Sequence, residues 1–176
     1  MIVAWHPEYH YHFEEKHTFP MEKYSLLKDY LLDHQIISQE QIHLPEEMSE
    51  EDILRLHCPE YWQRLKNLEL SKSEVRKTGF PQNANILRRE RLLAQGTLDV
   101  SLYALKNKSL GFNIAGGTHH AFSHRAEGYC LLNDQAIAAK HLIDQELCKR
   151  VLILDLDAHQ GNGTAEACRS YENIFT

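Results

Sequence analysis

The sequence predicts a three-layer α/β domain with a mainly parallel sheet, and two observations support this fold class. First, the run 112–115, a long loop, a helical segment and the apolar run Val151–Leu154 follow one another as a βαβ unit. Such a crossover joins parallel strands and is almost always right-handed. Second, Val151–Leu154 is continuously apolar, which is typical of a strand that is buried on both faces of a parallel sheet.

Composition limits the classes of protein that the chain can belong to. It has 176 residues, of which 43% are hydrophobic and 25% charged, so a folded domain with a real core is expected. The net charge of −6 argues against nucleic acid as the main partner. We expect no signal peptide or membrane span, and the four widely spaced cysteines favour a reducing cytoplasm.

The amino-terminal part is expected to be mainly helical. Apolar residues recur at helical spacing after Met21, Ser49 precedes three acidic residues as a helix cap does, and Pro59 suits a first helical turn. We therefore predict a strand over Ile2–Trp5, a loop over 6–20, helices over 21–32, from Ser49 and over 60–70, and a loop over 71–82.

The segment 83–106 is the longest helical pattern in the chain. Ile86, Leu93, Val100 and Ala104 lie on one stripe, and Gly96 interrupts it, which indicates close packing against a neighbour or a bend. The charged residues at 88–91 are interpreted as a solvated helix face.

The remaining elements follow from the βαβ unit. Its loop covers 116–132, Asn133 or Asp134 caps a helix that runs to about Leu147, and a strand follows over 151–155. Residues 173–176 resemble the opening of another strand. Because an unfinished sheet edge is a liability, either a short edge strand ends the domain or this is the first part of a longer protein, and we favour the second. We expect a single, partial domain over 1–176.

The strand end after Leu154 carries the clearest chemical signal. Alternate residues of an extended chain share one face, so Asp155, Asp157 and His159 can point the same way. Carboxylate oxygen and imidazole nitrogen are good ligands for zinc or a similar divalent ion, and ligands of α/β sheets bind at the carboxyl ends of strands. The alternative, that the two acids only cap a turn, fits this spacing less well.

A second segment with potentially catalytic side chains lies in the loop of the βαβ unit, and it should reach the same sheet edge. Gly116 and Gly117 allow a sharp turn before His119 and His120, which could act as general base and acid beside a metal-held water. The Tyr129–Cys130 pair could serve the site or pack in the core, and for Cys130 core packing is favoured.

Three motifs together resemble the zinc-dependent histone deacetylase family, which includes bacterial deacetylase-like amidohydrolases. They are Ala115-Gly-Gly-Thr-His-His-Ala121, Glu127-Gly-Tyr-Cys-Leu-Leu-Asn-Asp134 and Val151-Leu-Ile-Leu-Asp-Leu-Asp-Ala-His-Gln-Gly-Asn-Gly163. The resemblance spans most of the chain, at the amino-terminal end of the family's domain. It implies the arginase/deacetylase-like fold, here incomplete at the C-terminus.

The resemblance also implies roles for individual residues. Asp157 and His159 resemble two of the family's three zinc ligands. Main-chain carbonyls around Asp155, Asp157 and His159 resemble its inner potassium site. His119 and His120 resemble the tandem active-site histidines, with Asp155 bonded to His119. Gly128 and Tyr129 resemble the wall of the tunnel for an acyl-lysine stem. Asn162 stands where many members have an acid that supports the second histidine, and an amide supports an imidazolium less well than a carboxylate.

The function implied is removal of acetyl or other acyl groups from lysine side chains or similar amines. Acetylated lysine peptides or proteins, or acetylated small amines, would be the substrates, and Zn²⁺ or another divalent ion the cofactor. The family's third ligand and its tyrosine have no counterpart among these 176 residues, so the chain alone is expected to be inactive. The alternatives are a same-fold amidohydrolase acting on acetylpolyamines or other small amides, and a non-catalytic remnant or binding module.

Overall fold

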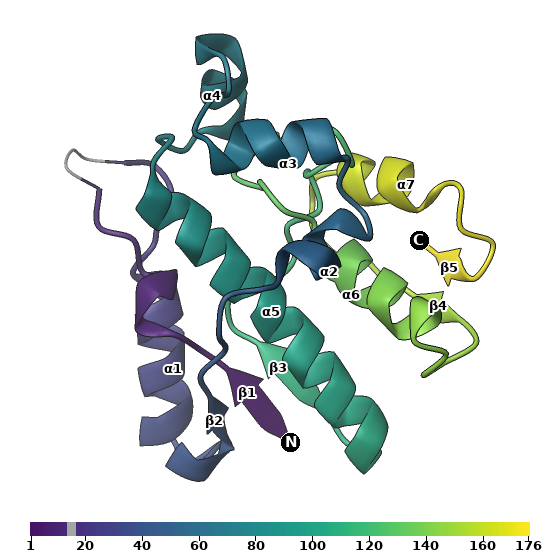
Figure 1. Cartoon of the computed structure of the whole chain (residues 1–176). Helices are drawn as coiled ribbons and strands as arrows, with labels where there is room; N and C mark the ends of the chain where they lie inside the picture. The colour runs from purple at the N-terminus through teal and green to yellow at the C-terminus, as the bar shows by residue number, and fades with distance from the viewer. Residues whose placement is uncertain (14–16) are drawn as a thin grey trace.

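The computed structural model describes residues 1–13 and 17–176 and confirms an α/β fold with parallel strand pairing (Figure 1). The strands are β1 Ile2–Ala4, β2 Ile42–His43, β3 Gly111–Asn113, β4 Val151–Leu152 and β5 Ile174–Phe175. The helices are α1 Lys23–Asp33, α2 Glu50–Leu54, α3 Pro59–Lys66, α4 Lys72–Thr78, α5 Ala84–Asn107, α6 Asp134–Asp144 and α7 Asn162–Cys168, with short 3-10 helices at Pro7–Tyr9 and Gln39–Gln41. None of these helices is both long and apolar enough to cross a membrane.

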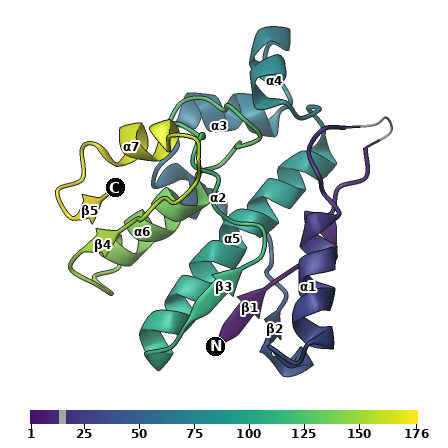
Figure 2. The same ribbon diagram turned by 180° about the vertical axis from the view of Figure 1, so that it is seen from behind.

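The strands form two separate sheets rather than one. One sheet has the order β2-β1-β3 and the other contains β4 and β5, with parallel pairing throughout. Figure 2 shows β4 and β5 beside α6 and apart from β1–β3. The expectation that the two strands of the βαβ unit belong to the same sheet is therefore wrong for this structure, since β3 and β4 do not pair.

Most predicted elements of the amino-terminal half are confirmed, but the loop over 71–82 is not. Residues 72–78 form α4, whose start is a capping box in which Ser71 and Glu74 bond each other's backbone N–H groups. This box was readable in the sequence as Ser-x-x-Glu. The preceding helix ends at Lys66 instead of Leu70, because Leu68 has a left-handed backbone (φ 60°). The predicted 6–20 loop includes residues 14–16, which lie outside the described residues.

Helix α5 packs across β1 and β3, and the absence of a side chain at Gly96 allows it to approach them closely. A Cβ atom on Gly96 would meet the Tyr9 hydroxyl and lie 3.2 Å from the Ala4 side chain, so close packing is confirmed. The solvated face expected at 88–91 is wrong for Arg89 and Glu90, which are both buried. Arg89 pairs with Glu90 and donates from Nε to the Tyr9 carbonyl at 2.8 Å. Sequence alone does not reveal the tertiary partner that makes this burial tolerable.

We expect the buried His57 to make folding stability depend on pH. Complete burial lowers its pKa to about 4, from an ordinary value of 6.5, despite opposing backbone interactions. Its stabilising contribution is therefore fully present above pH 6.5 and lost as the pH falls towards 4, amounting to about 2 kcal/mol between pH 7 and pH 5. Urea unfolding at the two pH values measures the loss.

The matched control is His57→Gln. Glutamine offers an oxygen to the Asn133 N–H, which donates to His57 Nε2 at 3.1 Å, but it does not titrate. The loss of stability between pH 7 and pH 5 should be smaller in this variant by about 2 kcal/mol. Equal losses in the two proteins would show that His57 is not the group responsible.

Candidate active site

The loops that follow β3 and β4 meet around one cavity of about 550 Å³. Six of the residues singled out in the sequence line it: His119, His120, Gly128, Tyr129, Asp157 and His159. The other two, Asp155 and Asn162, lie behind the histidines and contact their rings. The structure thus brings together all the predicted site residues, although paired members such as His120 and Asn162 lie 42 residues apart in sequence.

A buried carboxylate holds the turn that presents the histidines. Asn133 is the cap of α6, since its side chain accepts from the Ala136 N–H. Asp134 instead turns to the loop and accepts from the Gly117 N–H at 3.0 Å and the Thr118 N–H at 2.8 Å. It also accepts from the Thr118 hydroxyl at 2.6 Å. Multiple bonds to one carboxylate fix the backbone just before His119.

His119 is buried and paired with an acid. Its Nδ1 donates to the Asp155 Oδ2 at 2.6 Å, so Nε2 is directed away from the carboxylate. Partial burial pushes the pKa of the Asp155 carboxyl up, but the bonds from His119 and from the Asp157 N–H outweigh this and keep that pKa below its ordinary value. Gly161 is required here, because a Cβ atom would collide with the Asp155 carboxylate.

His120 has an amide partner instead of an acid. The Asn162 Oδ1 accepts from the Gly163 N–H at 3.0 Å, which identifies it as the oxygen of the amide, and it lies 2.7 Å from the His120 Nδ1. Neutral His120 therefore carries its proton on Nδ1 and leaves Nε2 free to accept one. The two imidazole rings lie side by side, with centroids 4.2 Å apart.

Asp157 and His159 form the exposed side of the site. Their side chains are 51% and 80% exposed, and Asp157 Oδ1 lies 3.0 Å from His159 Nδ1. Two ligands of one tetrahedral zinc ion are about 3.3 Å apart, so the carboxylate and the imidazole lie close enough together to share such an ion. Within residues 1–13 and 17–176, no group of three or more His, Cys, Asp or Glu side chains is placed to hold a metal. The chemistry of Asp157 and His159 is therefore compatible with zinc, but together they provide two of the ligands that a zinc site needs.

Aromatic side chains form one border of the cavity. Tyr129 has a left-handed backbone (φ 65°), and its ring packs against Phe19 and Phe80 with centroid distances of 4.9 and 5.2 Å. Its backbone N–H donates to the Thr78 carbonyl at 2.7 Å, which ties the loop to α4. Cys130 is buried, as favoured from the sequence, and burial raises the pKa of its thiol.

Several residues that were not predicted from the sequence also line the cavity, among them Phe19, Lys23 and Arg89. Burial, followed by repulsion from Arg89, lowers the pKa of Lys23, whereas Asp157 opposes that change. No local pattern marks these positions, because the amino-terminal loop and the start of α1 reach the site only through tertiary packing.

Comparison with known proteins places these features in context. Residues 17–176 match the sequence model of the histone deacetylase domain. An uncharacterised Picosynechococcus protein is 37% identical over 99% of this chain and 58% of its own length, and the acetoin utilization protein AcuC of Staphylococcus aureus is 32% identical over 88% and 42%. The crystal structure of an HDAC homologue from Aquifex aeolicus superimposes with a TM-score of 0.82 at 24% identity, covering 99% of this chain and 49% of that one. The chain spans about half the length of these relatives.

Proposed function

The chain belongs to the histone deacetylase domain family, and from that premise we propose that its site takes part in zinc-dependent removal of acyl groups from lysine side chains or similar amines. The observation that carries the proposal is the arrangement of two partnered histidines beside two converging metal donors. We further propose that residues 1–176 belong to one deacetylase-like domain. Acetylated lysine in a peptide or protein, or an acetylated small amine, is the proposed substrate.

Asp157 and His159 would hold the metal ion. When bound, zinc polarises the amide carbonyl and lowers the pKa of a bound water. The free Oδ2 of Asp157 and the imidazole of His159 are exposed to the cavity side and can both turn to an ion there. Catalytic zinc normally has three protein ligands, so these two side chains alone are expected to bind it weakly.

The two histidines differ in what they can do with a proton. His120 offers a free Nε2 and has only a neutral amide behind it, which suits a general base that takes a proton from water and later delivers it to the leaving amine. His119 has the Asp155 carboxylate behind it, which stabilises positive charge on its ring. His119 would therefore stabilise negative charge that develops on the substrate.

The substrate stem would enter along Gly128 and Tyr129. Gly128 has φ 52°, and a Cβ atom there would lie 2.7 Å from the His120 ring, so the missing side chain keeps the space beside His120 open. The Tyr129 and Phe19 rings give an apolar wall, which suits the methylene stem of a lysine. The backbone end of an acetyl-lysine substrate would remain outside.

Hydrolysis of an acetyl-lysine peptide with added zinc tests the proposal. We expect no turnover and only weak zinc binding from the 176-residue chain alone, because its described residues offer two metal donors. The same chain joined to the part of the Picosynechococcus relative that the match leaves uncovered should hydrolyse the peptide in proportion to bound zinc. Asp157→Ala in the joined protein should remove both zinc and activity.

Two results would count against this assignment. Tight, stoichiometric zinc binding by the chain alone would show that other residues complete the metal site. A joined protein that is folded and zinc-loaded but leaves the peptide intact would refute the proposed reaction.

A further inference from the structure

Part of the active-site cavity is lined by residues to which the proposed mechanism gives no role. Lys23 and Tyr24 from the start of α1 and Arg89 from α5 line the same cavity of about 550 Å³ as the histidines and the metal donors. These three residues are called the cationic compartment below. A cavity of that size can hold a ligand much larger than an acetyl group. The compartment is therefore a candidate site for the far end of a longer acyl group.

Arg89 brings a buried guanidinium to the compartment with one nitrogen left over. Its side chain is 2% exposed, Nε donates to the Tyr9 carbonyl at 2.8 Å, and Nη1 pairs with Glu90. Nη2 is buried and has no hydrogen-bond partner among the described residues. The lining of the cavity includes Arg89 but not Glu90, so the guanidinium reaches the cavity without its acid. A buried donor without a partner is costly, and an acceptor supplied by a ligand would remove that cost.

Lys23 places a second cation beside the first. Its Nζ lies 4.6 Å from the Phe19 ring centroid and 5.0 Å from that of Tyr24, and the Arg89 Cζ lies 5.3 Å from the same Tyr24 ring. Burial and then repulsion from Arg89 lower the pKa of Lys23. Within the described lining of the cavity the single carboxylate is that of Asp157, which is assigned to the metal ion. The two cations therefore meet in a cavity that has no other anion to balance them.

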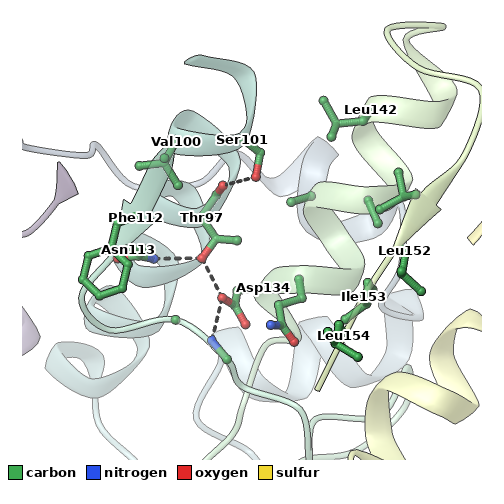
Figure 3. A pocket seen from close by; sticks show the side chains of 17 residues that line it. Thr97, Val100, Ser101, Phe112, Asn113, Asp134, Leu142, Leu152, Ile153 and Leu154 are labelled. Carbon is green, nitrogen blue, oxygen red and sulfur yellow. Dashed lines mark hydrogen bonds between the residues drawn. The ribbon is translucent and has the colours of Figure 1, made fainter. Parts of the chain in front are cut away.

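The backbone turn that also lines the cavity is restrained. Asp134 accepts from the Gly117 N–H at 3.0 Å and from the Thr97 hydroxyl at 2.6 Å. Asn113 Nδ2 donates to that hydroxyl at 2.8 Å, and Figure 3 shows these three bonds in a row. Because the turn is already fixed, a ligand in the cavity does not have to order it on binding.

We propose that the site acts on lysine side chains whose acyl group ends in a carboxylate, such as glutaryl-lysine or succinyl-lysine, and that Lys23 and Arg89 bind this carboxylate. The proposal rests on the proposed hydrolysis and names its substrate class. The amide would lie at the histidines and metal donors, and the acyl chain would cross the same cavity to the two cations. A carboxylate suits them because its two oxygens accept from a guanidinium and an ammonium together. An acetyl group would leave both cations without a partner.

The reaction is the same amide hydrolysis with a different acyl group. The oxygen of water bonds to the acyl carbon, the bond from that carbon to the lysine nitrogen breaks, and the nitrogen takes a proton. Glutaryl-lysine would give lysine and glutarate, which carries two carboxylates near pH 7. Water is the only reactant besides the acylated lysine.

Three peptides that differ only in the acyl group on lysine test the proposal, in the joined protein with zinc. They carry acetyl, glutaryl, and glutaryl whose terminal carboxylate is replaced by a primary amide, which keeps the shape and removes the charge. We expect kcat/KM for the glutaryl peptide to exceed that for its amide analogue at least about tenfold, the size expected for hydrogen bonds to a charged group.

Lys23→Met removes the ammonium and keeps an unbranched side chain against the Phe19 and Tyr24 rings. In this variant the ratio of kcat/KM between the glutaryl peptide and its amide analogue should fall about tenfold. Lys28→Met is the matched control, because Lys28 lies on the same helix but its Nζ is 4.6 Å from the Trp5 ring centroid and pairs with Asp29. The ratio should be unchanged in the control. Circular dichroism of both variants checks that the fold is retained.

Inhibition of acetyl-peptide hydrolysis by free acids separates two sources of a carboxylate. We expect glutarate to inhibit at a concentration at least about tenfold lower than acetate, because only glutarate has a second carboxylate for the cations while the first lies at the metal donors. Equal inhibition by the two acids, without a preference for the glutaryl peptide, would show that the cations hold only a released acid and would overturn the proposal.

The remaining outcomes also decide the matter. If the joined protein cleaves the acetyl peptide but treats the glutaryl peptide and its amide analogue alike, this substrate class is wrong and the proposed hydrolysis stands. A glutaryl preference that is equally strong in Lys23→Met would remove the cationic compartment as its cause. A folded, zinc-loaded joined protein that cleaves none of the three peptides would refute the proposed hydrolysis and this inference with it.

Discussion

Replacing His120 by alanine is expected to reduce kcat for acetyl-lysine hydrolysis by roughly 10²- to 10⁴-fold, the usual contribution of a general acid–base group. The variant removes the nitrogen that is free to take a proton, since His120 Nδ1 is committed to the Asn162 oxygen. His120 is not one of the two proposed metal donors, and its ring centroid lies 6.1 Å from that of His159, so zinc binding should be unchanged. Single-turnover hydrolysis and a zinc titration of the joined protein described above measure the two effects separately.

His124→Ala is the matched control for this variant. His124 lies four residues further along the same loop, but it is exposed and contacts Arg125 and Glu166 rather than the cavity. Its replacement should leave kcat within about twofold of the unaltered protein, as expected for an exposed residue away from the chemistry. Unchanged turnover in the His120 variant, or equal losses in both variants, would remove His120 from the proposed role.

Gly128→Ala should impair both folding and turnover. Gly128 has φ 52°, a conformation that costs an L-residue about 1–2 kcal/mol, and the new methyl group would lie 2.7 Å from His120 Cδ2. The ring must then move from its place beside His119, which misplaces the base relative to the substrate. A reduction of about 100-fold in kcat is the size that a displacement of about 1 Å can cause. Chemical unfolding and steady-state kinetics of the same preparation measure the two changes.

Gly117→Ala separates backbone strain from contact with the ring. Gly117 has φ 85°, but a Cβ atom there meets nothing within 4 Å. Both variants should lose the about 1–2 kcal/mol that a left-handed backbone costs an L-residue, whereas kcat should fall much further in Gly128→Ala, where the methyl group also meets the ring. If the two variants lose kcat equally, the contact between Gly128 and His120 is not what keeps the base in place.

Much of the site was predictable because its residues lie in short motifs with regular geometry. Alternation along an extended chain places Asp155, Asp157 and His159 near one another, and a glycine pair before His119 and His120 indicates a tight turn. We expected these two segments to meet because each follows the carboxyl end of a strand in the βαβ unit. Their pairing at 2.6 and 2.7 Å is consistent with that reasoning.

Other features could not be predicted because they depend on distant partners. The burial of Arg89 and Glu90 requires the Tyr9 carbonyl, about 80 residues away, to accept a bond from the guanidinium. Asp134 has the appearance of a helix cap in the sequence, yet it bonds the loop before the histidines. The α4 helix was missed for a different reason, since its capping box was present but was outweighed by nearby polar residues, glycine and proline.

The α/β fold class followed from residue types and short-range periodicity, which are local properties of a sequence, and the family followed from three short motifs. The pairings of Asp155 with His119 and of Asn162 with His120 were implied by the family resemblance, and the fold supplies their geometry. The packing of Tyr129 against Phe19 had no counterpart in the sequence analysis, because it joins segments about 110 residues apart. The separation of β3 and β4 into two sheets was likewise not predictable, because strand pairing is a contact between distant segments that local periodicity does not specify.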